Sequence, residues 1–116
     1  MPAPVLPAAE PQKLSAINMA TDKELFESWS DHVPSGKLAL VREVMHATAS
    51  SLGSTSNISK KKRALRECVE KLNRLDEGQH FIMTIEREDL VELLLSMGEE
   101  SGVVDTAEII DELREW

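Results

Sequence analysis

The fold of this chain is decided by the stretch SKKKRALRECVEKLNRLDE, residues 59–77. Its apolar side chains recur at steps of three and four, which places them on one stripe of an α-helix: Leu65, Cys68, Val69, Leu72 and Leu75. The opposite face carries opposite charges four residues apart, and each such pair adds about 0.2–0.5 kcal/mol to helix stability. The pattern therefore predicts a long amphipathic helix.

Four further segments carry a helical pattern: residues 21–33, about 37–52, 85–101 and the stretch from 106 to the C-terminus. We predict the following N-caps, because their side-chain oxygens can accept hydrogen bonds from the first backbone amides of a helix: Thr21, Ser59, Thr84 and Asp105. The 85–101 helix is apolar over more than half of its circumference, which is typical of a central helix. Residues 79–84 have no second strand to pair with, so we expect a buried connector there.

The chain has 116 residues, enough for one domain with a modest core. Residues 1–20 hold four of the five prolines, which cannot donate backbone hydrogen bonds, so we expect a flexible or loosely docked tail. Residues 21–116 are the expected single domain. Five helical segments joined by short loops predict an all-α fold, a compact bundle of four to five short helices.

Charge is distributed unevenly along the chain. The net charge is -8 at pH 7, which argues against nucleic acid or an anionic membrane as a partner. Residues 35–84 hold nine basic and five acidic side chains, a net +4, whereas residues 85–116 hold two basic and eleven acidic ones, a net -9. The sequence thus predicts a protein with a basic middle and an acidic end.

Cations crowd the start of the 59–77 helix and form the first candidate binding surface: Lys60, Lys61, Lys62, Arg63 and Arg66. Such a run is compatible with a solvated helix start paired with the acidic end of the chain. It is also compatible with a docking patch for a protein, with phosphate contacts or with a nuclear-import signal. Nucleic-acid binding is the weaker interpretation, since no aromatic side chains are interleaved for base stacking.

The acidic end of the chain forms the second candidate binding surface: Glu108, Asp111, Glu112, Glu115 and the terminal Trp116. The carboxylates are expected either to solubilise the protein or to meet a basic partner. Trp116 has two interpretations. If its side chain is exposed, it is a hot-spot anchor for a partner, and if it packs on the stripe of Ile109 and Leu113, it belongs to the core.

The spacing Glu43-x-x-His46 is an alternative candidate site, for a metal. Di-metal carboxylate bundles use this spacing twice, with a further Glu from each of two other helices. Here it occurs once, so the second copy would have to come from a homodimer. Helical spacing places Glu43 opposite Val41, the centre of the apolar face, and His46 on the flank, so both are expected to face solvent. We therefore predict no bound metal or cofactor.

The motifs of the common enzyme classes are missing. The glycines are isolated, and neither a phosphate loop nor a nucleophile elbow nor H-E-x-x-H occurs. Ser59-x-x-Lys62 matches one motif of serine acyl enzymes without its companions. His32 and His80 are expected as surface or capping residues, and Cys68 as a buried core thiol. The sequence predicts no enzymatic activity.

Localisation follows from two further absences. No stretch approaches the roughly 18 apolar residues of a membrane span, and the N-terminus does not have the pattern of a secretory signal. A single cysteine fits a reducing compartment. We expect a soluble, cytoplasmic protein.

These patterns favour a non-enzymatic interaction protein, a small acidic regulator, adaptor or inhibitor that binds a partner protein through a charge-polarised helical surface. Pairing of the basic helix of one copy with the acidic end of another makes a homodimer a corollary, and such a dimer should weaken as salt rises. The alternatives are the dimeric metal bundle and the nucleic-acid-associated factor.

Overall fold

The computed structural model describes residues 26–116, so the predicted tail and the predicted cap at Thr21 lie outside the described residues. The described part contains one 3₁₀-helix and four α-helices: η2 (Glu27–Asp31), α2 (Ser35–Gly53), α3 (Ile58–Asp76), α4 (Thr84–Glu100) and α5 (Thr106–Leu113). No strand occurs between residues 26 and 116. The prediction of an all-α bundle is confirmed.

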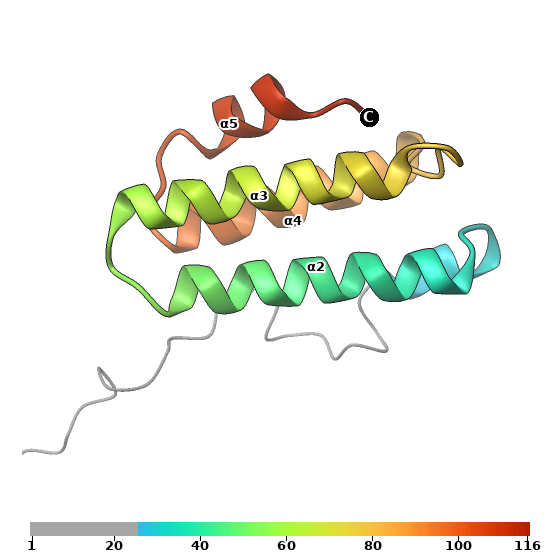
Figure 1. Ribbon diagram of the computed structural model, residues 1–116, viewed down its shortest axis with the longest axis horizontal. Coiled ribbons are helices and arrows are strands. Elements are labelled where there is room, and N and C mark those ends of the chain that lie inside the picture. The colour runs from blue at the N-terminus through green and yellow to red at the C-terminus, as the bar shows by residue number, and fades with distance from the viewer. Residues whose placement is uncertain (1–25) are drawn as a thin grey trace, which may run out of the picture.

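The three long helices α2, α3 and α4 form a bundle, and α5 lies on the side of α3 that faces away from α2 (Figure 1). The helix predicted over residues 85–101, which is α4, was expected to be central. Instead α3 makes the most extensive contacts, because α2 and α5 cover it from two sides. The additional apolar side chains of α4 are only partly buried: Val91, Leu93 and Leu95.

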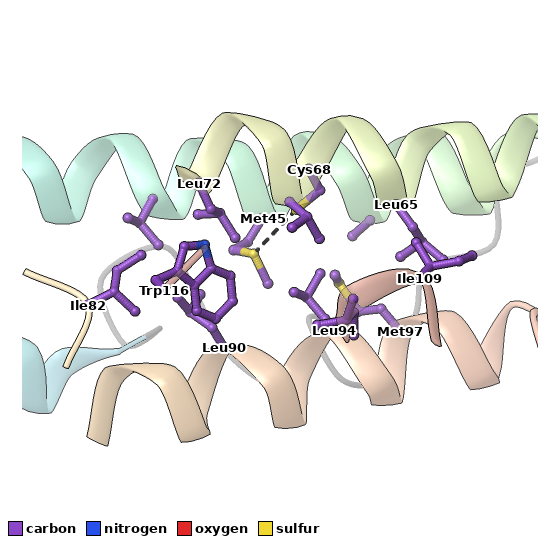
Figure 2. Packing of buried hydrophobic residues seen from close by; sticks show 14 of the residues in the cluster. Met45, Leu65, Cys68, Leu72, Ile82, Leu90, Leu94, Met97, Ile109 and Trp116 are labelled. Atoms are coloured by element: carbon purple, nitrogen blue, oxygen red, sulfur yellow. Dashed lines mark hydrogen bonds between the residues drawn. The ribbon is translucent and has the colours of Figure 1, made fainter. Parts of the chain in front are cut away.

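The core follows the stripe predicted on α3. Leu65, Cys68, Val69 and Leu72 are buried, and Leu75 is partly buried against them. Their neighbours come from each of the other α-helices and from the chain after α5, as Figure 2 shows for residues that include Met45, Leu90, Leu94, Ile109 and Trp116. One continuous hydrophobic cluster therefore holds the described helices together.

The helix predicted over residues 21–33 is wrong in its described part. Phe26 has a φ of 58°, a left-handed conformation that does not occur inside an α-helix, and only the short η2 follows it. The Phe26 ring stacks on Trp29 with ring centroids 4.4 Å apart, and Trp29 Nε1 donates a hydrogen bond to Asp89 Oδ2 of α4 at 2.9 Å. These contacts fix the segment against α4 in place of a regular helix.

Two of the predicted caps are displaced by one or two residues. Asn57, not Ser59, caps α3, because its side-chain oxygen accepts from Lys60 N at 3.0 Å. Met83 occupies the N-cap position of α4, so Thr84 is the first helical residue and not the cap. The positions and types of these two helices were nevertheless predicted.

The connector between α3 and α4 is buried only at its centre, whereas the sequence predicted a buried connector throughout residues 79–84. Residues 77–83 contain no strand, and Phe81 and Ile82 are buried whereas Met83 is exposed. The chain turns at Gly78, whose φ of +89° lies in the left-handed region that favours glycine. Two buried carboxylates flank this connector, one at the end of α3 and one in the first turn of α4.

Gly98 allows α4 and α5 to approach each other closely. A Cβ atom added at Gly98 would collide with the side chain of Thr106, the first residue of α5. Gly98→Ala should therefore lower the free energy of unfolding by about 1–3 kcal/mol, the usual range for overpacking. Urea unfolding measures this. The matched control is Gly36→Ala in α2, where nothing lies within 4 Å, and equal stabilities of the two variants would contradict the close approach.

Candidate functional site

The acidic surface predicted at the end of the chain lies on the outer face of α5. Thr106, Ile109 and Ile110 form the buried face of this helix. Its carboxylates point away from the core and are exposed: Glu108, Asp111 and Glu112, followed by Glu115 after the helix ends. Within residues 26–116, one of these four carboxylates forms an ion pair: Asp111 lies 3.6 Å from the guanidinium of Arg114 on the same segment. The structure thus brings these four predicted residues together on one surface.

The basic surface predicted on α3 is divided by the fold. Lys62 Nζ forms an ion pair with Asp105 Oδ2 at 3.2 Å, and Lys61 Nζ donates to the carbonyl oxygen of Ser101. Both cations therefore hold the loop between α4 and α5. Asp105 occupies the N-cap position of α5, as predicted, but its side chain makes no cap hydrogen bond and forms this ion pair instead.

The remaining cations of that surface stay exposed: Lys60, Arg63 and Arg66. Two exposed acidic side chains follow them on α3: Glu67 is four residues after Arg63, and Glu70 is four residues after Arg66. Helical spacing therefore gives a mixed surface, since residues three and four apart are neighbours. The free positive charge on α3 is smaller than the sequence indicated.

Trp116 is a core residue. Its side chain is 8% exposed, and Figure 2 shows it pointing into the core between α3 and α4. Asn73 of α3 fixes the backbone before it, because its amide nitrogen donates to Leu113 O at 2.9 Å and its amide oxygen accepts from Glu115 N at 3.0 Å. The interpretation of Trp116 as an exposed hot-spot anchor is therefore corrected.

The residues of the predicted metal spacing do not converge on a site. Glu43 is exposed and His46 is half-buried on α2. Within residues 26–116 no group of three or more His, Cys, Asp or Glu side chains is placed to hold a metal ion. The arrangement of the described residues gives the metal-bundle alternative no support.

Two buried carboxylates at the α3–α4 connector were not predicted as a cluster. Asp76 Oδ1 accepts from Ile82 N at 2.8 Å, and Glu86 Oε1 accepts from Met83 N at 2.9 Å, so they hold two consecutive backbone amides. The second oxygen of each carboxylate faces a histidine. His80 Nδ1 lies 3.4 Å from Asp76 Oδ2, and His32 Nε2 contacts Glu86 Oε2.

The electrostatics of Glu86 follow from these contacts. Burial disfavours its ionised form, but the hydrogen bonds from His32 and from the backbone N–H groups of Met83 and Glu86 outweigh burial and lower the pKa of the carboxyl below its ordinary value. The side chain of His32 is about half exposed. This cluster fixes the connector between the helices, and its only sequence signal was a glutamate in the first turn of α4.

Cys68 lies beside a small cavity between α2 and α3. The cavity has a volume of about 40 Å³ and is lined by residues that include Thr48, Ala64, Glu67 and Lys71. Burial raises the pKa of the Cys68 thiol to about 11, although a hydrogen bond from Thr48 and the charge of Lys71 oppose this. The thiol is therefore neutral near pH 7 and is a poor nucleophile. The cavity is of a size for water.

Comparison of the chain with protein-family models, with curated proteins and with solved structures gives no match. Among the described residues no helix is both long and apolar enough to cross a membrane. The acidic outer face of α5 is a candidate functional site because its carboxylates are exposed.

Proposed function

We propose that this protein is a non-enzymatic interaction module, a regulator, adaptor or inhibitor that binds a partner protein through its charge-polarised surface. The observation that carries the proposal is that part of the basic stretch is engaged within the fold, whereas the acidic stretch stays exposed. Lys61 and Lys62 serve contacts within the fold, whereas the four carboxylates of the α5 region remain exposed. The acidic face is therefore the binding surface, and its partner has a basic surface.

The residues of the acidic face suit an interaction surface physically. α5 is held against α3 and α4 by its apolar side and by both groups of the Asn73 side chain. Its carboxylates therefore project from a fixed backbone, and binding does not have to order the helix. Opposite charge on a partner accelerates the encounter of the two proteins, and salt weakens this effect.

A capture experiment with charge-reversed variants tests the proposal. The acidic-face variant replaces the four carboxylates by lysine: Glu108, Asp111, Glu112 and Glu115. The matched control makes the same change in net charge at exposed carboxylates elsewhere: Glu43, Glu88, Glu92 and Glu99. A protein captured from the native host's lysate by the wild type and the control, and lost with the acidic-face variant, is the expected result. Equal loss of the captured protein with both variants would show that only net charge matters. Unchanged capture by the acidic-face variant would rule out the acidic face as the binding surface.

A variant with reversed charge at Lys60, Arg63 and Arg66 tests the basic remainder of the predicted surface. These cations are exposed, and Arg63 and Arg66 each have an acidic neighbour four residues further along α3. We expect the reversed variant to retain the captured protein. Loss of the partner here, with retention in the acidic-face variant, would move the binding surface to α3.

A further inference from the structure

The segment from Thr106 to Trp116 lies on α3 and α4 in the way a peptide ligand lies in a helix-binding groove. Its apolar side chains follow a one-sided helical spacing, with Ile109, Ile110 and Trp116 buried and Leu113 partly buried. Anchors spaced like these are typical of an amphipathic helix bound in a groove. Both walls of the groove belong to helices that contact α5, and Figure 2 shows the Ile109 and Trp116 side chains between them.

The polar contacts of α5 with the groove lie at its two ends. Lys62 pairs with Asp105 before the helix, and Asn73 holds the backbone of Leu113 and Glu115 after it. The side chains of Lys62 and Asp105 are about one third exposed. Asn73 is half-buried, and Glu115, which it contacts, is exposed. The segment is therefore recognised by apolar and polar contacts with α3 and α4, and Thr106 Oγ1 additionally donates to Val103 O in the link to α4 at 2.7 Å.

α5 is a short helix that follows the three long helices in the described chain. It has eight residues, too few for a stable helix away from the groove. It takes no part in the contact between α2 and α3, and the apolar residues Ile109, Ile110 and Trp116 of its segment stay buried only while a copy of the segment occupies the groove.

The link to α4 is the loop after Glu100, where Gly102 has a φ of +94° and Val104 is 97% exposed. Between them Val103 is buried and its N–H donates to Gly98 O at 2.9 Å, so the loop is anchored at this residue.

We propose that the groove between α3 and α4 accepts residues 105–116 of a second copy of this chain, so that two copies exchange their α5 segments. The second copy is the occupant because its segment matches the groove residue by residue, which makes exchange a low-cost route to a dimer. The segment of the same chain competes at an effective concentration on the order of millimolar. The closed monomer therefore predominates in dilute solution, and exchange requires high concentration or a hinge that disfavours closure.

Gly102 is the residue that makes closure inexpensive. A φ of +94° costs a glycine little but strains any side chain with a Cβ, and a β-branched one most. A Cβ at Gly102 meets nothing within 4 Å, so the strain is confined to the backbone of the closed loop. Exchange opens the loop in both chains and relieves the strain twice. Gly102→Val should therefore strengthen the dimer about tenfold for each hinge, hence about a hundredfold in dissociation constant.

The first test measures the mass of the full chain in solution. Wild type and Gly102→Val are refolded at concentrations from about 10 μM to about 1 mM, the range set by the effective concentration of a short linker, and analysed by sedimentation and native mass spectrometry. Gly78→Val is the matched control, because Gly78 also has a positive φ and open space but lies before α4. Dimer in Gly102→Val and monomer in the control is the expected result. A monomeric Gly102→Val at the highest concentration would overturn the proposal.

The second test separates exchange from association of two closed monomers. Lys62→Glu and Asp105→Lys each place like charges in the closed contact that measures 3.2 Å in the wild type. When the two variants are mixed in the Gly102→Val background, exchange restores opposite charges in both grooves of the mixed dimer, so native mass spectrometry should find mixed dimers in excess of the statistical half. A statistical mixture would mean that the dimer forms without exchange of α5, and the proposal would fail.

This inference concerns the inner face of α5, whereas the proposed function concerns the outer face. A dimer formed by exchange keeps the four carboxylates exposed and carries two acidic faces. Loss of exchange therefore leaves the capture experiment unchanged, and loss of capture leaves the mixed-dimer experiment unchanged. The two proposals succeed or fail separately.

Discussion

Replacing Trp116 with alanine should lower the free energy of unfolding by about 3–5 kcal/mol, the range for truncation of a large aromatic side chain in a core. The indole is 8% exposed and belongs to the single hydrophobic cluster of the described residues. The side chain of Arg114 lies over its ring at 5.5 Å and donates to the carbonyl oxygen of Trp116 at 2.9 Å. Since a domain of this size has about 5–15 kcal/mol in total, the variant should be near the limit of folding.

Urea unfolding followed by far-ultraviolet circular dichroism measures the effect of Trp116→Ala. Glu115→Ala is the control, because its side chain is exposed and only its backbone N–H contacts Asn73, and surface changes of this kind stay within about 0.5 kcal/mol. Trp116→Phe should cost much less than alanine, since it keeps most of the ring and removes the Nε1–H, which is buried without a hydrogen-bond partner among the described residues. A decrease in the free energy of unfolding below about 1 kcal/mol in Trp116→Ala would contradict the burial of Trp116 and favour its interpretation as a surface anchor.

Strong periodicity made most of the fold predictable from the sequence. The stripe on α3 identifies the buried residues of that helix, because each of them faces the same side at 100° per residue. The same argument gives the positions of α2, α4 and α5 to within two or three residues. Helix ends were less predictable, since Asn57 and Ser59 are both good caps and the course of the chain before the helix decides between them.

The first described segment was not predictable for a different reason. The pattern around Trp29 satisfies a helix as well as it satisfies the observed η2. What decides between them is the left-handed conformation of Phe26 and the hydrogen bond from Trp29 to Asp89, which is 60 residues away. A long-range contact of this kind overrides local preference and leaves no local signal.

The sequence predicts which charged residues form the candidate site, but it does not predict which of them are engaged in contacts within the fold. The sequence shows where positive and negative charge occur along the chain, and α5 indeed presents its carboxylates outward. It does not show that the loop after α4 lies against the start of α3, which is why the engagement of Lys61 and Lys62 emerged only from the structure. The contact between His32 and Glu86 joins residues 54 apart, and no spacing rule connects them.

Glu86 should make the protein sensitive to acid. Its folded-state pKa is lowered, by the hydrogen bonds of His32 and of the Met83 and Glu86 backbone against the opposing effect of burial. A carboxyl whose pKa is depressed on folding contributes stability that is fully present above its unfolded pKa and is lost as the pH falls through its folded pKa. The contribution of Glu86 is therefore complete at pH 7 and declines below about pH 5, where an unfolded glutamate begins to take up its proton.

Glu86→Gln should remove this part of the pH dependence. The amide keeps an oxygen that can accept from Met83 N but has no charge to lose, so the stability of the variant should change less than that of the wild type between pH 7 and pH 3. Glu88→Gln is the matched control, because Glu88 is an exposed glutamate on the same helix and its loss changes the net charge equally. Urea unfolding at a series of pH values measures all three proteins. If Glu86→Gln and Glu88→Gln follow the same curve, the acid sensitivity reflects overall charge, and the buried carboxylate beside His32 has no special part in it.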